Sequence, residues 1–345
     1  MVLLVNQLAA RLFPLQLQTL LAKDAQLVAV AHVDKMENTI KIGTRGSSLA
    51  LWQANWVKDT ISGNHPDITV ELVIIKTKGD KILDVPLAKV GGKGLFVKEI
   101  EEALLDGRID IAIHSMKDMP AELPEGLCIG AIPERENPCD VVISKDGLKL
   151  SELPEGATVG TSSLRRSSQL YKVRPDFNIV ALRGNIDTRI KKLKAGEMDA
   201  IILAAAGVHR LGFKEVITEY IEHENMLPAV GQGALCIESR VNDKRIEEIL
   251  NEMNHHDTRV AVLCERAFLN RLEGSCQIPV AAHATVEDKK INLKGLVCDL
   301  DGKKRVEDFI LAPEDACESA GIELANRLLE KGADEILKKV MADVK

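Results

Sequence analysis

The chain has 345 residues, of which 46% are hydrophobic, 28% are charged and only 3% are aromatic. This is an ordinary globular composition, with enough chain for two or three domains. A formal net charge of −7 disfavours proteins that coat DNA or anionic membranes, and the few aromatic residues disfavour stacking on single-stranded nucleic acid. The 7 cysteines show no CxxC pair, which predicts reduced thiols in the cytoplasm rather than a disulfide framework or a zinc knuckle. No apolar run is long enough to span a membrane.

Residues 1–35 differ from the rest of the chain. They are rich in Leu, Val, Ala and Gln, and they match neither a secretory signal nor a typical transit peptide. A more regular pattern begins after Met36. We therefore treat 1–35 as an extension of unknown role that lies outside the fold.

Two segments of the chain repeat one order of motifs. Residues 40–49, 70–80 and 107–113 are matched by 157–166, 178–185 and 196–202. Each series gives a short apolar strand, a Gly-Thr turn with hydroxyl residues, a helix, a strand that ends at a basic-Gly turn, a helix, and a Gly-x-x-Asp strand. Strands alternating with helices predict parallel sheets with crossover helices, so we expect two tandem α/β lobes with a ligand-binding cleft between them.

The expected domain limits follow from this repeat. The first lobe covers 36–133 and returns at about 234–251, and the second lobe covers 139–227. Pro-containing stretches at 133–138 and 226–228 are the expected crossings between them. Residues 256–345 predict a small α+β domain, with a helix at 257–272, strands at 279–286 and 290–299, a hairpin turn at Asp301-Gly302, and helices at 314–331 and 333–342.

Basic residues gather in one part of the acidic chain. Residues 160–194 contain nine Lys or Arg against two Asp. A local basic focus on an acidic body suits a compact anionic ligand better than a long polymer.

The two Gly-Thr turns contribute Ser47 and Ser48 in one copy and Ser162 and Ser163 in the other. Such residues commonly cap helices. A turn that leads into a helix also presents free N–H groups and a positive dipole end to an anion. Because the turn occurs twice, with Arg45 in one copy and Arg165 and Arg166 in the other, capping and anion binding both stay open.

Arginines near the end of the 178–182 strand are further candidates. Arg183 ends this strand, where ligands of α/β folds lie, and Arg189 follows six residues later. Guanidinium groups pair bidentately with carboxylates, so several together can hold a substrate with many acid groups. For Lys191, Lys192 and Lys194 we favour a solvated helix face.

Polar residues 114–118 follow a strand that is expected to be buried. Asp118 could be a general base or a carboxylate that stabilises a developing cation. The alternative is that Lys117 and Asp118 form a surface ion pair. The glycine-rich segment 90–96 lacks the spacing of a Walker A loop; residues 77–93 predict a mobile lid or a plain flexible loop.

Cys276 lies on a Gly-Ser loop just after the predicted 257–272 helix. Most free cysteines, such as Cys236 and Cys264, are small core residues. Cys276 is the one best placed to serve as an accessible nucleophile.

Seven motifs, in this order, closely resemble hydroxymethylbilane synthases, also called porphobilinogen deaminases. They lie at 43–50, 87–98, 114–120, 160–166, 182–185, 227–234 and 273–279, and the resemblance runs from about Ile40 to the C-terminus. It implies three domains, the first two related to type II periplasmic-binding proteins. It also implies the head-to-tail condensation of four porphobilinogen molecules with release of ammonia, followed by hydrolysis to the linear tetrapyrrole.

The same resemblance implies a dipyrromethane cofactor on a thioether to Cys276, with no metal in catalysis. It further implies a cytoplasmic monomer that acts on a small-molecule substrate, without nucleic-acid, membrane or obligate protein partners. Asp118 would stabilise positive charge as ammonia leaves. The cofactor would be held by Lys117, Ser115, Ser163, Arg165, Arg166 and Arg183. The substrate would be held by Arg45, Ser47, Arg183, Arg189, Arg210 and Gln232. The lid would include Lys89, Lys93 and Phe96.

The rival hypothesis is a non-catalytic anion-binding or sensor protein with the same two lobes. It explains the duplicated turns and the arginines, but it gives no role to Cys276 or Asp118. Nucleic-acid binding through 160–194 is disfavoured by the net charge and the lack of aromatic residues.

Overall fold

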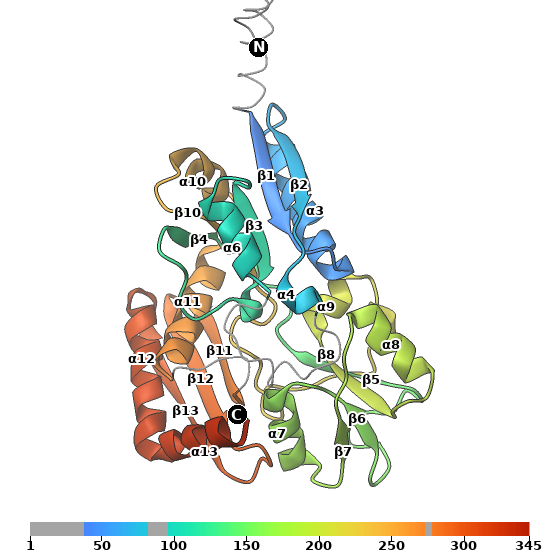
Figure 1. Ribbon diagram of the computed structural model, residues 1–345. Coiled ribbons are helices and arrows are strands. Elements are labelled where there is room, and N and C mark those ends of the chain that lie inside the picture. The colour runs from blue at the N-terminus through green and yellow to red at the C-terminus, as the bar shows by residue number, and fades with distance from the viewer. Residues whose placement is uncertain (1–37, 82–95, 273–277, 345) are drawn as a thin grey trace, which may run out of the picture.

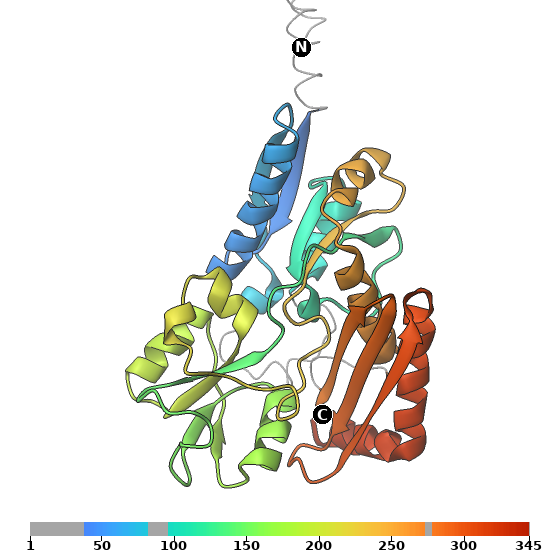
Figure 2. The same cartoon turned by 180° about the vertical axis from the view of Figure 1, so that it is seen from behind.

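The computed structural model describes residues 38–81, 96–272 and 278–344 (Figure 1). The extension 1–35, the lid residues Lys89 and Lys93, and Cys276 lie outside the described residues. Two α/β lobes and a smaller third domain make up the described chain, and the view from behind shows the same three bodies (Figure 2).

The first lobe contains a five-stranded sheet in the order β2-β1-β3-β10-β4. Strands β1 (Thr39–Thr44), β2 (Thr69–Ile74) and β3 (Ile111–Ser115) are parallel. Strand β10 (Leu235–Arg240) runs antiparallel to β3 and to β4 (Leu127–Ala131). The chain therefore returns to this lobe after completing the second one.

Helices cover both faces of this sheet. Because side chains alternate along a strand, β3 turns Ile111 and Ile113 to one face and Ala112 and His114 to the other. The first face packs against α3 (Ser48–Asn64) and α10 (Lys244–Asn251), and the second against α6 (Lys98–Leu105). A short helix, α4 (Lys78–Lys81), and a 3₁₀ turn, η1 (Met116–Asp118), complete the lobe.

The second lobe repeats this arrangement in the order β7-β6-β8-β5-β9. Its parallel strands are β6 (Thr158–Gly160), β7 (Asn178–Val180) and β8 (Ala200–Ala204). Strand β5 (Asp140–Ser144) is antiparallel to β8 and to β9 (Glu219–Tyr220). The helices are α7 (Leu164–Val173), α8 (Ile186–Lys194), α9 (Ala205–Arg210) and the 3₁₀ turn η2 (Lys214–Val216).

The expectation of parallel sheets is thus only partly right. Four strands of each sheet run in the same direction, but β10 in the first sheet and β5 in the second run against both of their neighbours. Each of these two strands begins where the chain arrives from the other lobe. The chain arrives from the other lobe at the carboxyl ends of the parallel strands. A strand that starts there runs back along the sheet, in the direction opposite to theirs.

The third domain is an antiparallel sheet with helices packed on it. Strands β11 (Val280–Glu287), β12 (Lys290–Cys298) and β13 (Arg305–Pro313) pair in chain order. Helices α11 (His256–Arg271) and α12 (Cys317–Leu328) cover it, with Phe268 and Leu324 fully buried between them. The 3₁₀ turn η3 (Glu314–Ala316) precedes α12, and the π turn η4 (Leu329–Ala333) leads into α13 (Asp334–Val344).

The predicted fold class, two tandem α/β lobes with a C-terminal α+β domain, is confirmed. Helix α11 also packs on the first lobe, where Val262 lies in one cluster with Val97 and Met116. Across the described ranges, no helix is long and apolar enough to cross a membrane.

Candidate functional site

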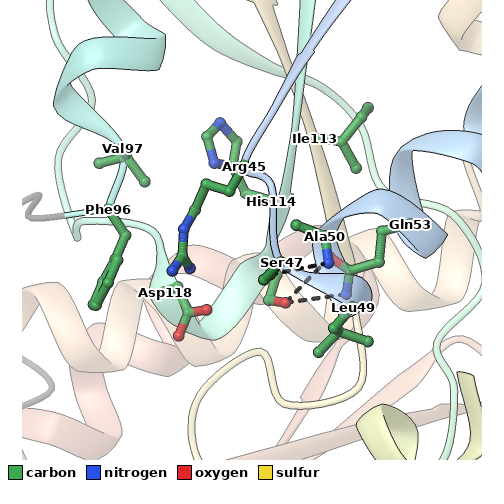
Figure 3. Close-up of a pocket in the computed structure, with 11 residues that line it drawn as sticks. Arg45, Ser47, Leu49, Ala50, Gln53, Phe96, Val97, Ile113, His114 and Asp118 are labelled. Atoms are coloured by element: carbon green, nitrogen blue, oxygen red, sulfur yellow. Dashed lines mark hydrogen bonds between the residues drawn. The ribbon is translucent and has the colours of Figure 1, made fainter. Parts of the chain in front are cut away.

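The candidate site forms where β1 and β3 of the first lobe end. A pocket with about 410 Å³ of empty space opens to solvent here, between the start of α3 and the segment that leads into α6 (Figure 3). Ser47 is the N-cap of α3, and its side chain accepts a hydrogen bond from the Ala50 N–H at 3.3 Å. The capping role is therefore confirmed for Ser47, while the positive end of α3 still faces the pocket.

The polar residues after β3 reach this pocket. Ser115 and Asp118 line it together with Gln53, whose amide nitrogen donates to Ser115 Oγ at 3.1 Å. Asp118 lies on the turn η1 and is exposed, so its carboxylate is free to meet a ligand. Arg45 and Asp118 both extend into the pocket beside Phe96 (Figure 3).

Arg45 is held by two neighbours. Its Nε and Nη2 atoms donate to Asp80 Oδ1 at 3.1 and 2.5 Å, and its guanidinium lies 4.2 Å from the centre of the Phe96 ring. Burial raises the pKa of Asp80, but the hydrogen bonds from Arg45 and Thr77 and the charge of Arg45 together lower the pKa overall. Since Nη1 takes no part in this pair, Arg45 can still bind an anion.

The second lobe places two arginines at the equivalent turn. Ser163 is the N-cap of α7, but its side chain makes no capping bond. Arg165 and Arg166 lie in the first turn of α7, where positive charge opposes the helix dipole, and both are buried. Asp140 compensates for them: its carboxylate accepts from Arg165 Nη1 at 2.7 Å and from Arg166 Nε at 2.9 Å.

Asp140 itself is fully buried at the start of β5. Burial raises its pKa, but the charges of Arg165 and Arg166 lower it well below the ordinary range. Two arginines thus share one fixed carboxylate. No sequence motif singles out Asp140, although an acid at the start of the apolar strand 140–144 is an unusual signal.

Lys117 connects the two lobes. Its ammonium donates to Gln232 Oε1 at 3.4 Å, and the Gln232 amide donates to Asp140 Oδ1 at 3.1 Å. Burial and the nearby charge of Arg166 lower the pKa of Lys117 to about 8. The charge of Asp118 opposes this fall, so Lys117 interacts both with the segment that joins the lobes and with Asp118.

Arg183 and Arg189 approach the same region from the second lobe. Arg189 Nε donates to Gly184 O at 2.8 Å. Burial, followed by the charges of Arg166 and Arg183, lowers the pKa of Arg189 to about 10, and Asp118 partly opposes this effect. The charge of Asp118, in the first lobe, thus acts on Arg189 in the second.

Two expected substrate-binding residues have structural partners. Arg210 donates from Nη2 to Gly233 O at 2.7 Å and lies over Trp52 of the first lobe, 5.9 Å from its ring centre. Gln232 holds Pro138 O at 2.7 Å as well as Asp140. Their binding roles stay predictions. Lys191 and Lys194 are exposed and Lys192 is half-buried.

Besides Arg45 and its partner Asp80, the site therefore combines five cations with two carboxylates. The cations are Lys117, Arg165, Arg166, Arg183 and Arg189, and the carboxylates are Asp118 and Asp140. Crowded like charges that lower one another's pKa are relieved by a bound anion. A dipyrromethane with acetate and propionate groups fits this donor set, and Ser163 Oγ, which has no hydrogen-bond partner within the described part of the chain, offers one more donor.

Comparison with known proteins bears on this arrangement. A family model described as "Porphobilinogen deaminase, dipyromethane cofactor binding domain" matches residues 40–248, and one described as "Porphobilinogen deaminase, C-terminal domain" matches residues 260–330. The chain belongs to the porphobilinogen deaminase family. The expected transferase, a hydroxymethylbilane synthase of tetrapyrrole biosynthesis with a dipyrromethane cofactor, is confirmed by these matches.

Individual porphobilinogen deaminases match over nearly their full length. The chain is 57% identical to that of Geobacter metallireducens over 301 residues, covering 87% of this chain and 94% of the relative. It is 55% identical to that of Geobacter sulfurreducens over 303 residues, covering 88% and 95%. Among solved structures, the periplasmic aliphatic sulphonate-binding protein SsuA of Escherichia coli matches with a TM-score of 0.37 and 14% identity, covering 68% of this chain and 70% of that one.

Proposed function

We propose that this chain joins four porphobilinogen molecules head to tail at the pocket around Asp118, and then releases the linear tetrapyrrole by hydrolysis. The observation that carries the proposal is the single exposed carboxylate, Asp118, set among cations that are contributed by both lobes. Such a site binds the acid side chains of a pyrrole and presents one negative charge to its ring.

Asp118 stabilises the positive charge that develops on the pyrrole as ammonia leaves. Its position after β3 is fixed by the sheet and by Met116, which is buried against α11. A carboxylate that is held in place before the reaction needs little reorganisation in the transition state, and this makes its charge effective.

The cations bind and orient the acid side chains. Arg45 and Ser47 hold the incoming substrate on the first lobe, and Arg183 and Arg189 hold it from the second. The cofactor is held by Lys117, Ser115 and Ser163. Asp140 fixes the side chains of Arg165 and Arg166 at the start of α7. Arg210 and Gln232 act through the segments that join the lobes.

The dipyrromethane cofactor, when bound through Cys276, supplies the pyrrole end to which substrate units are added. The proposed lid includes Lys89, Lys93 and Phe96. Of these, Phe96 lies within the described residues, and its ring under Arg45 supports its place beside the pocket. We further propose the domain limits 36–133 with 234–251, 139–227 and 256–345, which agree with the strand membership of the three sheets.

The cellular setting is also a proposal. We infer a cytoplasmic enzyme that works as a monomer without nucleic-acid, membrane or obligate protein partners. The composition supports this inference, as do the six cysteines that are free thiols in the described ranges.

The intact mass of the purified protein tests the cofactor assignment. We expect an adduct of two pyrrole units, lost in Cys276→Ser and kept in the control Cys317→Ser. An unmodified, inactive chain from cells that make porphobilinogen would contradict the proposal.

Asp118→Asn tests the catalytic assignment. We expect turnover of porphobilinogen to fall about 100- to 1000-fold because the preorganised charge is lost, while the adduct remains on Cys276. The control Asp67→Asn alters an exposed acid at the end of the α3–β2 connection and should leave turnover unchanged. Full activity in Asp118→Asn would refute the role.

A further inference from the structure

Three ionisable residues lie together behind the pocket. His114 on β3 and Glu238 on β10 point to the face of the first sheet that α6 covers, since His114 pairs with Cys236 and Ala112 pairs with Glu238. Glu101 reaches the same place from α6. We call Glu101, His114 and Glu238 the buried triad.

The triad is almost completely removed from solvent. Glu238 is 0% exposed, His114 5% and Glu101 7%. His114 Nε2 lies 3.1 Å from Glu238 Oε2. In both Glu101 and Glu238, the carboxylate oxygen Oε1 has no hydrogen-bond partner among the residues that the structure describes.

Stability does not explain this arrangement. The adjoining cluster of Ile100, Ala103 and Leu104 is apolar, and burying carboxylates without full hydrogen bonding costs stability. Replacing such a set with apolar side chains would often be neutral or stabilising. Buried groups of this kind mark functional sites, and this one adjoins a functional pocket because His114 itself lines that pocket.

A metal ion is not the natural occupant. Within the described ranges, the ligand atoms that converge closely enough for a metal are those of His256, Asp257 and Glu314, on the surface of the third domain. The buried triad does not meet this condition. A proton is the cation that two buried carboxyl groups and an imidazole can share.

We propose that Glu101, His114 and Glu238 are positioning residues that hold one exchangeable proton behind the pocket, and that the charge of this triad sets how strongly the pocket binds substrate carboxylates. The proposal rests on the function proposed above for the pocket. His114 acts through its place in the pocket wall, directly before Ser115 and four residues before Asp118.

The proton is exchangeable near neutrality. Burial, followed by the charge of Glu238, raises the pKa of Glu101 to about 7, while His114 opposes the rise. Below this pH Glu101 is neutral, and above it the triad carries one more negative charge. Substrate carboxylates are then repelled, so KM rises as the pH passes through about 7.

Other titratable and charged groups surround the triad, and they come from four secondary-structure elements and from the pocket. The titratable and charged groups that face it are Glu102 on α6, Cys128 on β4, Cys236 on β10, Arg259 and Arg266 on α11, and Arg45 across the pocket. The arginines keep their charge throughout the neutral range, and burial raises the pKa of Cys236 above that range. We assign the proton exchange near pH 7 to Glu101, because burial and the charge of Glu238 raise its pKa to this range.

The first test needs no turnover. Carbon NMR of the holoenzyme with glutamate labelled at the carboxyl carbon should show one signal that titrates near pH 7, alongside exposed glutamates that titrate in the acid range. The signal should vanish in Glu101→Gln and persist in the matched control Glu102→Gln, since Glu102 is the exposed neighbour on the same helix. If every glutamate of the wild-type enzyme titrates in the acid range, the proposal is overturned.

The second test joins the triad to the reaction. The wild-type KM for porphobilinogen should rise about three- to tenfold across pH 7, with a smaller change in kcat. This rise should disappear in Glu101→Gln and remain in Glu102→Gln. In Glu238→Gln its midpoint should move to lower pH, because the negative neighbour of Glu101 is gone.

The outcomes separate the two proposals. An unchanged pH dependence of KM in Glu101→Gln would refute the link to the pocket, even where the NMR signal is present. Lack of any turnover in the wild-type protein would refute the proposed function, and the NMR titration would still report on the triad.

Discussion

The two Gly-Thr turns occupy the same place in their lobes but are built in opposite ways. In the first lobe, Ser47 caps α3 and Arg45 stands outside the helix, where it faces a half-exposed Asp80. In the second lobe, the serine at the cap makes no capping bond, and Arg165 and Arg166 lie within the first turn of α7, locked to the buried Asp140.

This difference suits the two turns to the different binding roles that we propose for them. The first turn is a complete helix start beside a pocket that is open to solvent, so an incoming substrate can reach it. The second is an incomplete helix start whose charges are fixed by burial. A fixed set of cations suits a ligand that stays bound, such as a covalently held cofactor.

Removing the acid that pairs with the arginines of each turn should give the largest difference between the two turns. Asp140→Asn leaves Arg165 and Arg166 buried without a counter-charge, and we expect the free energy of unfolding to fall by about 3–5 kcal/mol. Asp80→Asn removes the partner of Arg45, which is partly solvated, and should cost at most about 1 kcal/mol. Urea unfolding followed by circular dichroism measures both. Equal losses would contradict the comparison.

Removing a ligand-facing arginine should have an intermediate effect. Because we propose that Arg183 donates to a substrate carboxylate, KM for porphobilinogen should rise about tenfold or more in Arg183→Gln, while the melting temperature stays unchanged. The exposed Lys194 belongs to the same basic segment, and Lys194→Gln is the control. Steady-state kinetics measure KM in both variants. If KM changes by a similar factor in both, the basic segment attracts substrate only through its overall charge, and Arg183 has no specific role.

Replacing the serine at each helix start should give the smallest effects. We expect a loss of stability at Ser47 and slower cofactor uptake at Ser163. Ser47→Ala removes the capping bond to Ala50 and should lower stability by about 1 kcal/mol. Ser163→Ala removes no capping bond, so stability should hardly change, while uptake of the cofactor by the apoprotein slows. Thermal unfolding and a mass-spectrometric time course distinguish the two. A clear loss of stability in Ser163→Ala would show that its hydroxyl is structural.

The sequence carries the local parts of this site. The duplicated turns reveal the two lobes, because the same short motifs must start the same helices. Asp118 and Ser115 are found from their place after a buried strand. The strand 140–144 is equally visible as an apolar run, but nothing local links its first residue to arginines that lie 25 positions later.

Long-range features are out of reach of such patterns. Local motifs do not show that β5 and β10 enter their sheets from the opposite end, because strand direction depends on where the chain arrives from. The same holds for the buried triad: Glu238 stands in an apolar strand, which is a signal, but its contact with His114 joins residues 124 positions apart.

The position of β10 in the first sheet has a consequence for how the chain folds as it is synthesised. All five strands of the second lobe lie in one continuous stretch from β5 to β9, whereas in the first lobe β10 separates β3 from β4. The first sheet therefore cannot close until residue 240 has left the ribosome, although synthesis of the lobe began about 200 residues earlier. The second lobe can fold first, from contacts that are closer in sequence. The turn η1 with Asp118 is synthesised early, but it takes its final place only after the second lobe, which carries Arg165 and Arg166, has folded.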